Sequence, residues 1–105
     1  MSTFDKKEKS EEARYKHDEE LRFRIISRRN KLLGLWAAGQ MELPEDDANA
    51  YAGEVVELQF ERDGDSAVLR KISADLASKG LGISDDSVRT QMDDCLAQAT
   101  AQLTA

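Results

Sequence analysis

The chain holds few side chains of the types that catalyse reactions, and their spacing does not bring them together. His17 is the only histidine, and it opens an acidic run that ends at Glu20 and contains residue types that bind metal ions. Consecutive residues of a helix point about 100° apart, so these four side chains cannot all face one ion. The run is better interpreted as a solvated helix face, and we expect no metal site.

The other candidates for chemistry have simpler structural interpretations. Cys95 lies on an apolar stripe with no histidine near it in sequence, which favours a buried structural thiol over a nucleophile. The segment Gly80 to Ser84 lacks the Lys-Ser/Thr ending of a phosphate loop and fits a helix terminator followed by a helix cap. Asp63 and Asp65 resemble the start of a calcium loop, but Val68 stands where that loop needs glycine. We therefore expect no catalytic residue, no cofactor and no enzymatic activity.

The first two dozen residues are dominated by charge. Fourteen of residues 1–24 are charged, and the stretch contains neither glycine nor proline. Glu12, Asp18 and Glu20 each precede a basic residue by four positions, an order that stabilises a helix by a few tenths of a kcal/mol per pair. The stretch can therefore be helical, yet it has few groups to bury against its own domain.

This pattern divides the chain into two parts. We interpret residues 1–19 as an arm that is disordered or partly helical when free, and residues 20–105 as a four-helix domain. Phe4 and Tyr15 are the only aromatic residues of the arm and are natural anchors for apolar pockets of a partner.

The charges are distributed unevenly between the two ends of the chain. Residues 1–31 carry ten basic and seven acidic side chains, a balance of +3; residues 32–105 carry five and fourteen, a balance of −9, which together give the net charge of −6. An acidic body disfavours nucleic acid as a partner, because affinity for phosphate backbones comes largely from cationic contacts. No apolar run approaches the roughly 20 residues that a membrane helix needs, so we expect no direct membrane insertion. The single cysteine fits a cytoplasmic protein.

Apolar residues recur with helical spacing in four stretches, separated by helix-ending signals. The stretches are Leu21 to Trp36, Ala48 to Phe60, Val68 to Leu76 and Val88 to Leu103. The helix-ending signals between them are Gly39 with Pro44, Asp63 with Gly64, and Gly80. Asp46 and Asp47 are acidic residues that favour the first turn of the second helix. Asp65 and Ser84 are the predicted N-caps of the third and fourth helices. The sequence therefore predicts an all-α fold: a four-helix bundle with a mobile, helix-prone N-terminal arm continuous with the first helix. A monomer is expected, because one bundle accounts for all four stripes.

One sizeable positive cluster lies just after the arm. It comprises Arg22, Arg24, Arg28, Arg29 and Lys31. It is either a solvated helix face or a docking patch for an acidic partner surface. A further alternative is an adenine-nucleotide-sensing helical adaptor, in which Arg28 and Arg29 meet a phosphate and Trp36 meets the base. Trp36 on a helical stripe is otherwise a core residue, although the run from Leu32 to Gly39 is apolar nearly all round and could partly face a partner.

Three segments together resemble one known family. They are Phe4 to Lys7, His17 to Arg24, and Arg28 to Ala38. The sequence is similar to the zeta subunit family, the small inhibitors of the alphaproteobacterial F-type ATP synthase that were formerly a domain of unknown function. The resemblance implies that the arm enters a cleft between catalytic subunits of the rotary head, near the central stalk, and blocks rotation in the ATP-hydrolysing direction. The four-helix body would remain outside as an anchor.

The resemblance also implies a location and a set of contacts. The protein would be cytoplasmic and peripheral to the inner membrane, held there through ATP synthase. The expected partner-binding residues are Phe4, Asp5, Lys6, Lys7, Glu8, Glu12, Tyr15, His17, Arg22 and Arg24.

Overall fold

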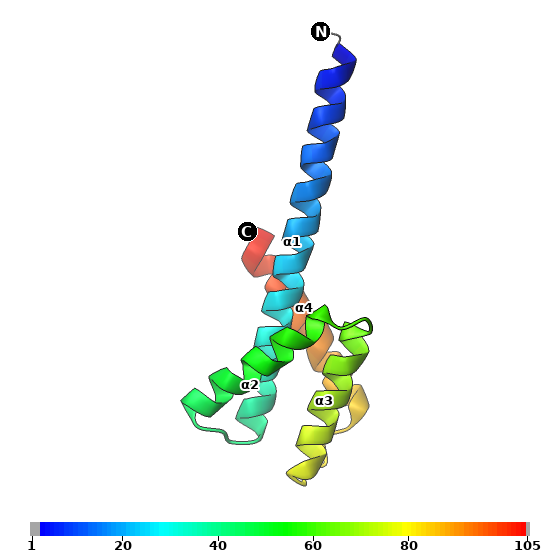
Figure 1. Ribbon diagram of the computed structural model, residues 1–105. Helices are drawn as coiled ribbons and strands as arrows, with labels where there is room; N and C mark the ends of the chain where they lie inside the picture. The colour runs from blue at the N-terminus through cyan, green and yellow to red at the C-terminus, as the bar shows by residue number, and fades with distance from the viewer. Residues whose placement is uncertain (1–2, 105) are drawn as a thin grey trace.

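The computed structural model describes the backbone of residues 3–104 and the side chains of residues 17–104. Within that part of the chain all regular structure is helical: α1 (Thr3–Gln40), α2 (Glu45–Glu57), the 3-10 turn η1 (Leu58–Phe60), α3 (Gly64–Ser78) and α4 (Asp85–Thr104) (Figure 1). The prediction of an all-α four-helix bundle is confirmed. The predicted arm is continuous with the first helix, since α1 runs without a break from Thr3; its mobility stays a prediction.

The long helix α1 is the axis of the molecule. Its 38 residues account for most of the longest dimension, 66 Å, because each residue of an α-helix adds about 1.5 Å. α2 and α4 pack along α1, whereas α3 packs mainly against α4 and η1. Figure 1 shows that only the C-terminal part of α1 is surrounded by other helices, and that α4 ends beside its middle.

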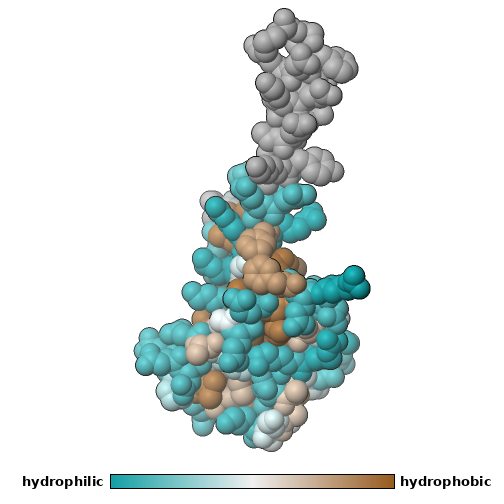
Figure 2. All heavy atoms as spheres, viewed as in Figure 1, coloured by the Kyte–Doolittle hydropathy of each residue, from teal (hydrophilic) through white to brown (hydrophobic). Residues whose placement is uncertain are grey.

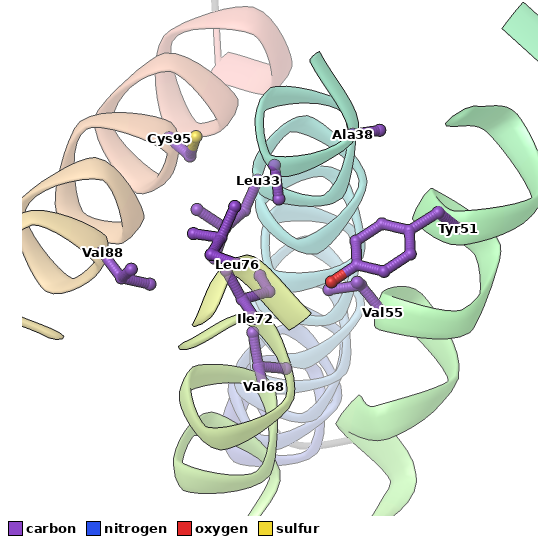
Figure 3. Packing of buried hydrophobic residues seen from close by; sticks show 10 residues of the cluster. Leu33, Ala38, Tyr51, Val55, Val68, Ile72, Leu76, Val88 and Cys95 are labelled. Atoms are coloured by element: carbon purple, nitrogen blue, oxygen red, sulfur yellow. The ribbon is translucent and has the colours of Figure 1, made fainter. Parts of the chain in front are cut away.

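The core lies where the C-terminal half of α1 meets the other three helices (Figure 3). Every helix contributes aliphatic side chains with no exposed surface, among them Leu33 from α1, Val55 from α2, Ile72 from α3 and Val88 from α4. Burial of such a side chain stabilises the fold by about 1.5–3 kcal/mol. The apolar run in α1 is mostly covered: Leu33, Ala37 and Ala38 are buried, and Trp36 packs half-buried against the core.

α1 and α2 approach each other closely at Gly34. A Cβ atom built on Gly34 would lie 2.7 Å from the Ala52 Cα atom, closer than any real side chain tolerates. Gly34 and the small side chain of Ala52 therefore allow the backbones of the two helices to touch, which places Val55 of α2 against α1.

Most of the predicted helix ends are confirmed. Gly80 ends α3 in the left-handed conformation, with φ of 66°. The Ser84 Oγ atom accepts a hydrogen bond from the Ser87 N–H (3.1 Å), which caps α4 as expected. Asp46 and Asp47 lie in the first turn of α2. α1 ends between Gly39 and Pro44, but its left-handed residue is Glu42, with φ of 56°.

The predicted cap at Asp65 is wrong. α3 begins at Gly64, and its N-cap position is Asp63, two residues before the predicted cap; Asp63 makes no side-chain capping bond. Asp65 instead lies in the first turn of α3, where a carboxylate favours the positive helix end, and its side chain bonds to an arginine of α1.

Candidate functional site

Two phenylalanine side chains are exposed together where α1 emerges from the bundle. Phe23 of α1 is 52% exposed and Phe60 of η1 is 66% exposed. Their rings form a tilted pair, with centroids 5.9 Å apart and planes at 47°. Figure 2 shows hydrophobic residues gathered on this part of α1, bordered by hydrophilic ones. Large aromatic groups exposed as a pair are typical of contact surfaces rather than of an isolated monomer face.

An open groove of about 430 Å³ lies beside this pair. Its walls come from α1, α2 and the last turn of α4, and we refer to it as the junction groove. The lining residues are Phe23, Arg24, Ser27, Arg28, Lys31, Val56 and Leu103. The groove therefore has an apolar floor and a basic rim.

The basic rim follows one face of α1. Arg24, Arg28 and Lys31 are spaced by four and three residues, which places them on one side of the helix. All three are exposed, and no ion pair among the side chains of residues 17–104 engages any of them. Arg28 does donate a hydrogen bond from Nη1 to the Gln102 Oε1 atom of α4 (2.9 Å).

The helical ion pairs read from the sequence do not neutralise this face. Among the described side chains, neither Asp18 and Arg22 nor Glu20 and Arg24 form an ion pair, although their spacing allows it. The charges of this stretch are therefore directed to solvent.

The place of Phe60 differs from the sequence prediction, which put it on the buried stripe of the second helix. α2 ends as an α-helix at Glu57, and the chain continues as the 3-10 turn η1, whose tighter winding takes Phe60 off that stripe. A hydrogen bond from Ser27 Oγ to Gln59 Oε1 (2.9 Å) holds η1 against α1. The sequence does not predict the exposed pair, because the change of winding has no clear residue signal. The one available signal is Phe23, which lies off the apolar stripe and beside basic residues.

Arg29 has a different role from its neighbours in the basic cluster. It is only 3% exposed, and its Nη2 atom donates to Asp65 Oδ1 of α3 (2.6 Å) and to Asn30 Oδ1 (2.9 Å). Its Nε atom also donates to Asn30 Oδ1 (3.1 Å). A buried guanidinium needs such partners, because an unpaired charge in the interior is strongly destabilising. Arg29 thus ties α1 to α3 instead of facing a ligand.

The three residues proposed for an adenine nucleotide do not share a pocket. Arg28 lines the junction groove, whereas Arg29 lines a separate depression between α3 and α4, and Trp36 packs against the core. Within the part of the chain whose side chains are described, the nucleotide hypothesis therefore has no common site to support it, and it stays a prediction.

The predicted partner-binding residues fall into two groups. His17, Arg22 and Arg24 are exposed on α1. The side chains of the remaining seven lie outside the described residues. These are Phe4, Asp5, Lys6, Lys7, Glu8, Glu12 and Tyr15.

A second polar cluster joins α2 to α3 and has the features of a structural network. Tyr51 donates a hydrogen bond to Asp75 Oδ2 (2.8 Å), and the Lys71 ammonium lies 3.2 Å from the same oxygen and 3.3 Å from Glu54 Oε2. Burial, and then the hydrogen bond to Asp75, raise the pKa of Tyr51 well above its usual range. Burial alone would lower the pKa of Lys71, but its bonds to Asp75 and Glu54 outweigh that effect and raise it.

The other residues considered for chemistry also have structural surroundings. Cys95 is buried in the core, and burial raises the pKa of its thiol, which opposes formation of a nucleophilic thiolate. No group of metal-binding side chains occurs among residues 17–104. Of the helices described, none has the length and apolar character to span a membrane.

The fold and the site define a small all-α protein whose most distinctive surface, aromatic and arginine-rich, has the composition of protein contact sites. The model of the family described as ATPase inhibitor subunit zeta matches residues 1–102. The chain belongs to this family, which consists of regulatory proteins rather than enzymes, and the resemblance seen in the sequence is confirmed.

Comparison with solved structures supports the fold independently. A protein whose structure was determined by NMR in solution is 42% identical to this chain, with a TM-score of 0.70. The match covers 80% of this chain and 95% of that one. Among curated proteins, no sequence matches this chain.

Proposed function

We propose that this protein inhibits ATP hydrolysis by an F-type ATP synthase, with residues 1–19 entering the catalytic head near the central stalk. Membership of the ATPase inhibitor subunit zeta family is the observation that carries this proposal. The inserted segment would block rotation in the hydrolysing direction, and residues 20–105 would anchor it from outside. The protein would then be held at the inner membrane through the enzyme.

The distribution of buried residues supports this division of labour. All buried side chains among residues 17–104 lie between Arg29 and Ala99, so the bundle does not use residues 17–19 in its core. The N-terminal part of α1 projects beyond the other helices, as an inserting segment requires (Figure 1). Phe4 and Tyr15 are its proposed apolar anchors, with the charged residues from Asp5 to Glu12 contacting polar groups of the cleft.

Deletion of residues 2–19 tests the proposal directly. We expect the truncated protein to keep its circular dichroism and thermal transition, because the core lies C-terminal to the deletion, and to lose inhibition of ATP hydrolysis by the cognate enzyme. ATP synthesis should be unaffected by either form. Full inhibition by the truncated protein would show that the N-terminal segment is not the inhibitory element.

A double substitution tests whether the two aromatic side chains contribute to inhibition when the segment keeps its full length. Phe4→Ala with Tyr15→Ala should weaken inhibition at least tenfold, because truncated aromatic anchors lose their pocket contacts. Thr3→Ala with Ser10→Ala is the matched control on the same segment and should inhibit like the unmodified protein. Equal inhibition by both double variants would contradict the role given to the aromatic residues.

A further inference from the structure

We propose that the junction groove binds an acidic amphipathic helix of the partner ATPase, as a second contact separate from the inserted segment. This inference rests on the proposed function, since it names a further element of the same partner. The groove offers an apolar floor, an exposed aromatic pair and a row of three basic side chains on one helix face.

The charge of the rim selects the chemistry of the occupant. Arg24, Arg28 and Lys31 are cationic and outside any ion pair among the described side chains, while residues 32–105 carry a balance of −9. A local cationic row on an acidic body attracts an acidic segment and repels a basic one. An extended anionic membrane is disfavoured, because it would repel a body whose residues 32–105 carry a balance of −9.

The spacing of the rim selects the shape of the occupant. The rim positions are separated by four and three residues, so they extend over about 10 Å of α1. A partner helix with carboxylates three or four residues apart presents charges at the same interval, and its apolar stripe would then meet Phe23, Val56 and Leu103. Phe60, projecting beside the groove, would cover one side of that stripe.

A second copy of the chain is a poorer occupant. The apolar stripes of α2, α3 and α4 contribute to the core, so these helices offer no free apolar face to another copy. A symmetric contact of the groove with itself would place Arg24, Arg28 and Lys31 opposite like charges.

The test uses full-length protein and the purified catalytic head of the cognate enzyme. Arg24→Glu with Lys31→Glu should weaken binding of the head at least tenfold and flatten the dependence of affinity on salt. Lys79→Glu with Arg89→Glu carries the same change of net charge at exposed positions that do not line the groove, and it should bind like the unmodified protein. Equal weakening by both pairs would indicate a general charge effect and would overturn the proposal.

Two further measurements keep the result independent of folding and of the inserted segment. Phe60→Ser removes only an exposed ring, and we expect it to weaken binding severalfold with an unchanged thermal transition. A photoreactive phenylalanine analogue at position 60 should crosslink to an acidic amphipathic helix of the head. Crosslinking to a second copy, to lipid or to a non-acidic segment would overturn the proposal, as would the absence of any crosslink.

The outcomes distinguish this inference from the proposed function. If deletion of residues 2–19 abolishes inhibition while the groove variants bind normally, the groove proposal fails and the inhibitory role of the segment stands. If the groove variants lose binding while the deletion leaves inhibition intact, the groove proposal stands and the segment proposal fails.

Discussion

Residues 17–28 and residues 29–40 belong to one helix, α1, but only the second of these two halves contributes buried side chains to the bundle. Residues 17–28 have no buried side chain, whereas residues 29–40 include Arg29, Asn30, Leu33, Ala37 and Ala38, all buried. The difference shows that helical structure alone does not assign a segment to the core. The helix continues without a break across the boundary between residues 28 and 29, whereas among residues 17–40 the buried side chains begin there.

The boundary between the halves coincides with Arg29, the first buried side chain among residues 17–40. Arg29 bonds to Asp65 of α3, whereas Arg28, one position earlier, is exposed on the rim of the junction groove. Stability should therefore depend mainly on the second half of α1, and partner binding mainly on the first half together with Lys31.

The largest difference between the two halves of α1 should appear when one large apolar side chain is truncated in each half. Leu33→Ala should lower the free energy of unfolding by about 2–5 kcal/mol, because it opens a cavity in a fully buried site. Phe23→Ala should change it by less than about 1 kcal/mol, since half of that ring is already in water. Chemical denaturation measures both. Similar losses would show that the first half of α1 also belongs to the cooperative core.

The close contact between α1 and α2 sharpens the comparison further. Gly34→Ala should cost about 1–3 kcal/mol, because the added methyl group meets the Ala52 backbone. Gly53→Ala is the matched control on the exposed side of α2, where a Cβ meets nothing within 4 Å. It should stabilise the protein by about 0.5–1 kcal/mol through helix propensity. Stabilisation by both changes would contradict the tight contact.

The ion pair at the boundary allows a third comparison. Asp65→Ala should destabilise the fold by about 1–3 kcal/mol, because it removes one partner of a buried guanidinium. Asp63→Ala removes the partner of Arg70 in an exposed pair, and it should have a much smaller effect because solvent screens exposed ion pairs. Thermal unfolding of the two variants at one pH would reveal the difference, and an equal effect would argue against a structural role for Arg29.

Alkaline pH should lower the stability of the four-helix body. The pKa values of Tyr51 and Lys71 are raised in the folded protein, so above about pH 10 the unfolded chain releases these protons first and stability falls. Each group can contribute a loss of at most about 1.4 kcal/mol per pH unit. Tyr51→Phe removes one of these titrations, and its stability should decline less steeply between pH 10 and 11 in urea titrations. A curve parallel to that of the unmodified protein would contradict the raised pKa of Tyr51.

The sequence predicted the helices because their signals are local. Gly80 ends α3 where expected, because glycine adopts positive φ without strain. Ser84 precedes α4 where expected, because its hydroxyl accepts a hydrogen bond from a free amide of the first turn. The stripes that fill the core, including Leu33 and Val88, follow from helical periodicity alone.

The site was harder to predict because its members come from distant parts of the chain. Arg28 and Arg29 are adjacent in sequence, and only the position of α3 makes one of them buried. Phe60 leaves its stripe because the helix tightens at Leu58, and its contact with Phe23 joins residues far apart in the chain. Asp65, predicted as a cap, is recruited by Arg29 instead.

An uninterrupted α1 also works as a ruler. Between Phe23 and Thr3 the backbone advances by about 30 Å, because each residue contributes about 1.5 Å and turns the chain by about 100°. If one subunit of the partner binds the groove, the number of residues between the groove and Thr3 fixes two quantities. These are the distance of the N-terminal end of α1 from that subunit and the direction in which its side chains point around the helix axis. Inserting a single residue into this part of α1 would change that distance by only about 1.5 Å, but it would rotate every side chain N-terminal to the insertion by about 100° around the helix axis.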